Sequence, residues 1–175
     1  MGEVIVMSVT PSTLFSNIFT AFYNRLTADL VDPITRNYGS TRWIFSSFPN
    51  VDIESGKISY PIIIIEPVNG SFEPWTLTKN VMRGTVNITA YSTSAAQADN
   101  LLDQIQTSIE SHRRTLKSEE GLGSVLPTST DTDWIMHGET KIHFRNISYQ
   151  FTKRFSSGIA MTEIPKTLAS DAVIA

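Results

Sequence analysis

The sequence predicts an α+β fold: a mostly antiparallel sheet packed on one side by two α-helices, with an extended hairpin or loop and a C-terminal arm. Residues 85–91 alternate apolar and polar side chains, as a half-buried strand does. The apolar residues of segment 98–109 then recur at helical spacing. Residues 11–30 repeat the helical pattern and residues 141–155 the strand pattern, so helices and strands share one domain.

The first helix is expected to start at Thr10 or Ser12, after a short β-like segment at residues 3–9. Pro11 suits the first helical position, where its missing N–H group costs nothing. An apolar stripe of core residues follows at helical spacing: Leu14, Phe15, Ile18, Phe19, Phe22, Leu26 and Leu30. Asp32-Pro33 ends the helix, because the residue before a proline disfavours helical dihedral angles.

The segment Tyr60–Glu66 is expected to be a central strand covered on both faces, because its four consecutive isoleucines leave no polar face. Pro61 and Pro67 lie at its two ends, where proline is tolerated. The segment Val68–Met82, which joins this strand to the next, is too long for a tight hairpin. It is therefore expected to be an extended hairpin or a protruding loop.

The second helix is expected to run from Ser94 to about Leu116. Ser94 can cap its first turn, and Gln97, three residues later, completes a capping box. The segment Ser118–Asp133 contains two glycines among many small polar residues. We therefore expect it to be a loop.

Two closing strands are expected at Asp133–Met136 and Lys141–Phe155, joined by a turn. The apolar residues of the longer strand change from one face to the other along its length. This slip predicts a β-bulge near Arg145-Asn146, or a strand that leaves one core and enters another. Residues 158–175 lack periodicity and are expected to form an arm, which leaves residues 1–157 as a single domain.

The composition excludes several classes of protein. A length of 175 residues with 41% hydrophobic and 18% charged residues is typical of one globular domain. The absence of cysteine excludes disulfides, thiolate metal sites and a cysteine nucleophile. A net charge of −3 gives no overall attraction to nucleic acid. The apolar run Ile62–Ile65 is far shorter than a membrane span, so no membrane partner is expected.

The candidate catalytic groups form no recognisable constellation. None of the three histidines has the spacing of a zinc motif. Asp131, Asp133 and His137 could converge on a metal, but acidic residues in turns beside strands are common. The glycine-containing segment 121–124 matches neither a nucleophile elbow nor a phosphate-binding loop. We therefore predict no enzyme activity, no cofactor and no metal.

Five residues are the candidates for binding a partner. Phe72, Trp75 and Leu77 are apolar residues in the segment after the central strand, where they either fold back onto the domain or contact a partner. Arg145 and Tyr149 belong to the long last strand, which contains no proline to block pairing at its edge. That strand is expected to pair with another subunit.

The order of elements resembles that of the tail-terminator, or tail-completion, proteins of long-tailed phages, which join tails to heads. The matching segments are Pro11–Leu30, Tyr60–Ile65, Arg83–Tyr91 with Ser94–Arg114, and Lys141–Phe155. The resemblance implies a structural virion protein of the tail or neck, made in the host cytoplasm, that works without a cofactor.

The same resemblance implies a set of partners. Copies of the chain would form a ring, usually a hexamer, that caps the finished tail tube and ends its polymerisation. The ring would bind the tail tube protein on one side and the head connector or stopper protein on the other. DNA would pass through its channel without sequence-specific binding.

Two alternatives stay open. A head-completion or stopper protein would bind the portal side, although the sequence lacks the marked pattern of a β-barrel. A cytoplasmic α+β enzyme or small-ligand binder would be a monomer with a closed apolar pocket, whereas a ring of subunits would argue against it.

Overall fold

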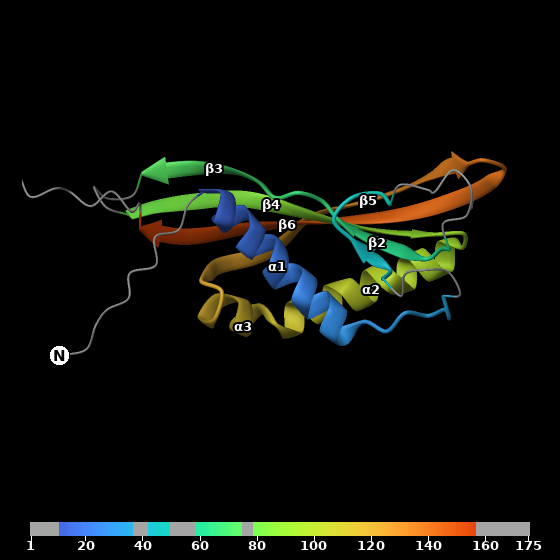
Figure 1. The fold of residues 1–175 in the computed structure, drawn as a ribbon, viewed down its shortest axis with the longest axis horizontal. Coiled ribbons are helices and arrows are strands. Elements are labelled where there is room, and N and C mark those ends of the chain that lie inside the picture. The colour runs from blue at the N-terminus through green and yellow to red at the C-terminus, as the bar shows by residue number, and fades with distance from the viewer. Residues whose placement is uncertain (1–10, 37–41, 50–58, 75–78, 157–175) are drawn as a thin grey trace, which may run out of the picture.

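A computed structural model describes residues 11–36, 42–49, 59–74 and 79–156 of the chain. Figure 1 shows a long sheet with the helices gathered on one side of it. The elements are α1 (Pro11–Asp29), β1 (Ile44–Phe45), β2 (Ile62–Ile65), β3 (Asn69–Pro74), β4 (Lys79–Ser92), α2 (Ala95–Ser111), α3 (Arg113–Ser118), β5 (Leu122–His137) and β6 (Thr140–Ser156).

The sheet is mixed, and its strand order is β1-β2-β4-β6-β5. Only β1 and β2 are parallel, and the other neighbours are antiparallel. β2 and β3 share β4 between them: β2 pairs with its second half and β3 with its first. The predicted fold class is therefore confirmed, with three helices in place of two. The expected extended hairpin is formed by β3 and β4.

β4 and β6 pair without interruption from Lys79↔Ser156 to Ser92↔His143. The bulge predicted near Arg145-Asn146 is wrong, because the register is continuous there. The alternative prediction describes β6 better, since its apolar residues serve two sides of the sheet. Tyr149 lies on the helix side with a ring centroid 6.1 Å from that of Phe22.

The other end of β6 uses the opposite face. Phe144 has its ring centroid 5.7 Å from that of Tyr91 on β4, and Tyr91 in turn lies edge-on to Phe48. Phe144 is even-numbered and Tyr149 odd-numbered, so the alternation of a strand points them to opposite faces. The change of phase in the sequence therefore marks the point where the apolar residues of β6 pass from the helix-free face to the face that the helices cover.

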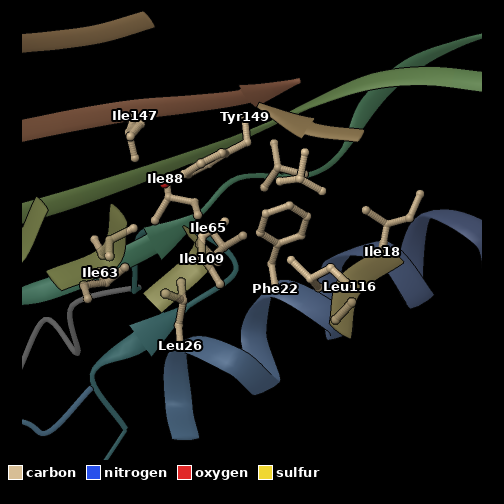
Figure 2. Packing of buried hydrophobic residues seen from close by; sticks show 14 of the residues in the cluster. Ile18, Phe22, Leu26, Ile63, Ile65, Ile88, Ile109, Leu116, Ile147 and Tyr149 are labelled. Carbon is tan, nitrogen blue, oxygen red and sulfur yellow. The ribbon is translucent and has the colours of Figure 1, made fainter. Parts of the chain in front are cut away.

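The main core lies between the sheet and the helices (Figure 2). Its members are buried apolar side chains from α1, β2, β4, α2, α3 and β6, among them Phe22, Leu26, Ile63, Ile65, Ile88, Ile109, Leu116, Ile147 and Tyr149. Each such side chain stabilises the fold by roughly 1.5–3 kcal/mol through its removal from water. β2 is buried along its whole length, as expected for a central strand.

The second helix is shorter than predicted. α2 ends at Ser111, and His112, with φ −95° and ψ 5°, separates it from α3. Nδ1 of His112 lies 3.2 Å from a carboxylate oxygen of Asp29 at the end of α1. The expected capping box is also absent: Ser94 makes no side-chain cap, and the Oε1 of Gln97 accepts a 2.5 Å hydrogen bond from Ser92.

The largest correction concerns β5. The expected loop at Ser118–Asp133 is, from Leu122 onward, one edge of the sheet, and β5 pairs with β6 as far as His137. The two irregularities in this pairing lie between Leu122 and Ser124 and between Pro127 and Ser129. Proline is tolerated at bulges and edges because no ladder hydrogen bond needs its N–H group there.

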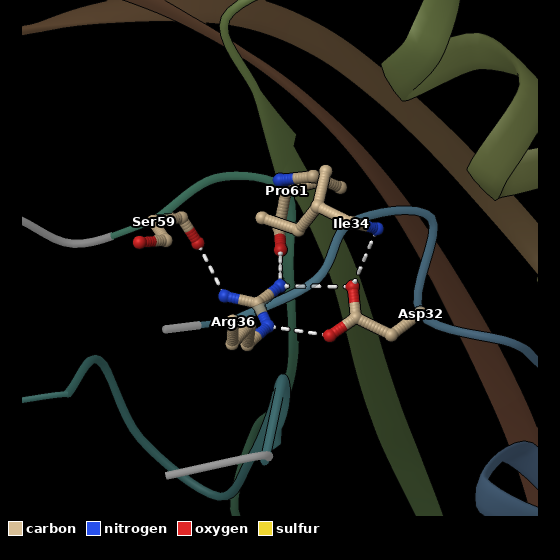
Figure 3. Close-up of polar contacts among 5 residues, drawn as sticks. All are labelled: Asp32, Ile34, Arg36, Ser59 and Pro61. Carbon is tan, nitrogen blue, oxygen red and sulfur yellow. Dashed lines mark hydrogen bonds and ion pairs between the residues drawn. The ribbon is translucent and has the colours of Figure 1, made fainter. Parts of the chain in front are cut away.

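Arg36 ties the segment after α1 to the start of β2 (Figure 3). Its guanidinium donates to the carbonyl oxygens of Ser59, at 2.5 Å, and Pro61. It also pairs with the carboxylate of Asp32, whose Oδ2 lies 2.5 Å from Nε. The Arg36 side chain is only 7% exposed. One cation therefore satisfies a carboxylate and two backbone carbonyls at once.

We predict that Arg36→Ala lowers the free energy of unfolding by about 2 kcal/mol, because the two carbonyls lose this donor and Asp32 keeps only the hydrogen bond from the N–H group of Ile34. The matched control is Arg113→Ala at the start of α3, whose partner Glu110 lies near the end of α2; both side chains are more than a third exposed. That pair is worth less than about 0.5 kcal/mol. Urea denaturation measures both values, and equal losses would contradict the role given to Arg36.

Tyr149 gives a second prediction. Its side chain is fully buried, and its hydroxyl has no hydrogen-bond partner among the described residues. Burial, and secondarily the carboxylate of Glu110, raises the pKa of this hydroxyl above the ordinary value of 10.0. The fold thus disfavours the ionised form, so this group's contribution to stability is complete below about pH 10 and is lost as pH rises further.

Tyr149→Phe removes this hydroxyl while keeping the ring. We expect the free energy of unfolding at pH 7 to stay equal or rise by up to about 1 kcal/mol. Above about pH 10 the variant should lose less stability than the wild type. Denaturant melts at both pH values measure this, and a clear loss at pH 7 would show that the hydroxyl is hydrogen-bonded.

Candidate interaction surface

Phe72 is the one member of its predicted trio that the structure describes, since Trp75 and Leu77 lie outside the described residues. It stands on β3, and its ring lies edge-on to Phe15 of α1 and Phe155 of β6, with centroids 5.8 and 5.7 Å away. The residue is nevertheless 44% exposed. Phe72 therefore packs onto the domain and also offers an apolar surface.

Arg145 and Tyr149 lie on the side of β6 that faces the helices. The guanidinium of Arg145 binds the carboxylate of Asp99 on α2, with Nη2 3.4 Å from Oδ2. The Arg145 side chain is only 14% exposed, and this ion pair links the sheet to α2. Tyr149 lies in the core with no exposed surface on which a partner could bind.

Sequence reasoning missed the end of the β5–β6 hairpin as an apolar surface. Trp134, Ile135 and Met136 are 50%, 39% and 55% exposed. A two-residue turn follows them, and its Gly138 has φ 61°, which only glycine adopts without strain. The sequence does contain a signal for this surface. Three consecutive apolar residues next to a tight turn point to both faces of a hairpin, and one core cannot cover both faces.

This hairpin end projects beyond the helices at one end of the sheet (Figure 1). The Nζ of Lys141 lies 4.5 Å from the centre of the Trp134 ring and shields one side of it. The β3–β4 hairpin, with Phe72, lies at the opposite end of the sheet. Large apolar side chains are thus exposed at both ends of the long axis: a cluster of three at the hairpin end, and Phe72 on β3 at the other.

The outer edge of the sheet is β5, not β6. β6 pairs with β4 on one side and β5 on the other, so the predicted edge pairing of the last strand is wrong. β5 is 16 residues long, and Leu126–Met136 is exposed throughout. No described strand pairs with its outer side.

The middle of the helix-free face is polar. Asn146 donates to the hydroxyl of Thr89 at 2.8 Å, and Ser148 donates to the side chain of Asn87 at 2.7 Å. Asn87 donates in turn to Glu66 at 2.9 Å. These hydrogen bonds link β2, β4 and β6, and they explain the polar half of the alternation in residues 85–91.

The grooves of the molecule are open and basic in part. One of about 680 Å³ is lined by Arg83, Lys117 and Arg154, with the backbone of Gly121 and Gly123 beside them. Among the described residues, no group of three or more acidic or histidine side chains could hold a metal ion.

His137, considered above as a metal ligand, has its Nδ1 3.3 Å from the hydroxyl of Tyr60. This contact joins the hairpin end to the start of β2.

None of the helices in the described part of the chain is long and apolar enough to cross a membrane.

Comparison with known proteins finds no family model and no curated protein that this sequence matches.

We predict that Phe72→Ala lowers the free energy of unfolding by about 1–2 kcal/mol, because two edge-to-face ring pairs are lost. Trp134→Ala is the control: it removes an exposed aromatic ring of the hairpin end and should cost less than about 1 kcal/mol. Thermal and denaturant melts compare the two variants. A larger loss at Trp134 than at Phe72 would contradict the packing described.

Proposed function

We propose that this protein is a tail terminator of a long-tailed phage. Copies of it form a ring, hexameric if the family resemblance holds, that caps the tail tube and ends its polymerisation. The ring then joins the tail to the head connector. The support is the order of elements, to which the structure adds a sheet with helices on one side and exposed apolar side chains at its two ends.

The observation that carries this proposal is the exposure of large apolar side chains at opposite ends of the sheet, with Trp134, Ile135 and Met136 at the β5–β6 hairpin end and Phe72 at the β3–β4 end. A closed ring is built from heterologous contacts, in which one surface of a subunit meets a different surface of its neighbour. In the proposed ring, the hairpin end of one subunit meets the β3–β4 end of the next.

The polar face of the sheet fits the same role. Its hydrogen-bonded amide and hydroxyl groups on β4 and β6 need no partner to satisfy them. A ring wall of this kind allows DNA to pass without holding it, because tight non-specific binding to DNA requires many cations directed at phosphates.

Removing the gene from the phage that carries it tests the proposal. We expect tail tubes of uncontrolled length beside filled heads that lack tails. Supplying the wild-type protein should restore normal tails. The variant Trp134→Ser/Met136→Ser should fold but fail to restore them, because truncating an interface anchor costs about 2 kcal/mol or more of binding free energy.

Val31→Ser is the matched control for that variant, since Val31 is 82% exposed and belongs to the segment after α1, outside both hairpins. It should restore normal tails fully. Tails of normal length with leaking heads would point instead to a head-completion or stopper protein. Unchanged assembly without the gene would exclude both roles.

A further inference from the structure

The outer edge of β5 carries backbone groups that its neighbour cannot use. In an antiparallel pair, alternate residues exchange both of their hydrogen bonds with the partner strand, and the residues between them point their N–H and C=O groups outward. β5 has β6 as its only neighbour among the described strands. Half of its N–H groups therefore face away from the sheet.

Two of these outward donors are occupied by carboxylates. The N–H group of Thr132 donates to Oδ1 of Asp131 at 2.8 Å. The N–H group of Trp134 donates to Oδ1 of Asp133 at 2.7 Å. Each aspartate thus folds onto the donor of the residue after it, and hydrogen bonds to an ionised acceptor are about twice as strong as neutral ones.

Pro127 removes a further donor from the same strand. It has no N–H group, and the pairing of β5 with β6 shifts register between Pro127 and Ser129. Proline, bulges and charged side chains are the means by which proteins prevent edge strands from pairing with other chains. β5 carries all three.

Every copy of the protein carries the same β5 edge, so β5 of a second copy is a partner strand that is present wherever the protein is. Antiparallel pairing of two such strands about Thr132 places Asp131 of each copy opposite Asp133 of the other. Like charges directly opposite one another destabilise a pair of strands. The exposed side chains of Trp134 and Met136 would otherwise favour this contact, because pairing would bury them.

We propose that the edge of β5 is a latent self-pairing surface and that Asp131 and Asp133 keep it closed to β5 of a second copy. The two carboxylates do so by occupying the outward N–H groups and by charge repulsion. This inference concerns the isolated chain, so it stands or falls independently of the role in phage tails.

The test compares the wild type with Asp131→Ala/Asp133→Ala by sedimentation velocity over a range of protein concentrations. The control, Asp103→Ala/Glu139→Ala, changes the net charge by the same amount at two exposed positions off the β5 edge. We expect the alanine pair to form larger species with a dissociation constant at least about tenfold lower than that of the wild type. The control should sediment as the wild type does.

Hydrogen exchange measured by NMR locates the contact. In the alanine pair, the amides of Thr132 and Trp134 should exchange rapidly at low concentration and become protected as concentration rises. A second pair, Asp131→Asn/Asp133→Asn, keeps an acceptor oxygen but removes the charge, and it should associate less than the alanine pair. Equal sedimentation of all four proteins, or association without protection of these two amides, would overturn the proposal.

Discussion

The unbroken pairing of β4 with β6 is the constraint on which the rest of the structure depends. Because side chains alternate along a strand, this register decides which residues face the helices and which form the polar face. A slip of one residue would exchange Tyr149 and Ile147 for Ser148 and Asn146 on the core side. The hydrophobic core and the polar hydrogen bonds both hold the register, since each would be lost in the slipped alternative.

The surface features follow from the length of these two strands. Because a strand rises about 3.3 Å per residue and a helix only about 1.5 Å, β4 and β6 reach further than the helices that cover them, and their hairpins extend past the core at both ends. Apolar residues at those ends have no helix to cover them, which leaves Phe72 and Trp134 exposed to a degree unusual for aromatic residues. The outer strand β5 is exposed for the same reason and carries its own protection against pairing.

Elements that bury one face could be predicted from the sequence, because burial imposes a period. This holds for α1 and for the strand that runs into α2, whereas β2 could be predicted because four consecutive isoleucines leave no polar face. β5 could not be predicted in the same way: almost none of it is buried, and only its pairing with β6 makes it a strand. Of the candidate binding residues, Phe72 could be predicted from its place in the segment after the central strand, and it is partly exposed. Tyr149 is buried, and its alternation with Ile147 and Phe151 in the sequence already indicated a core position.

If copies of this chain cap the tail tube, electron cryomicroscopy of tails purified before they join heads will show it most directly. We expect one closed ring of copies at a single end of the tube, with the β5–β6 hairpin end of each subunit against the β3–β4 end of its neighbour. Tube ends that carry no ring of this protein, or a ring whose subunits meet through neither end, would contradict the proposed role.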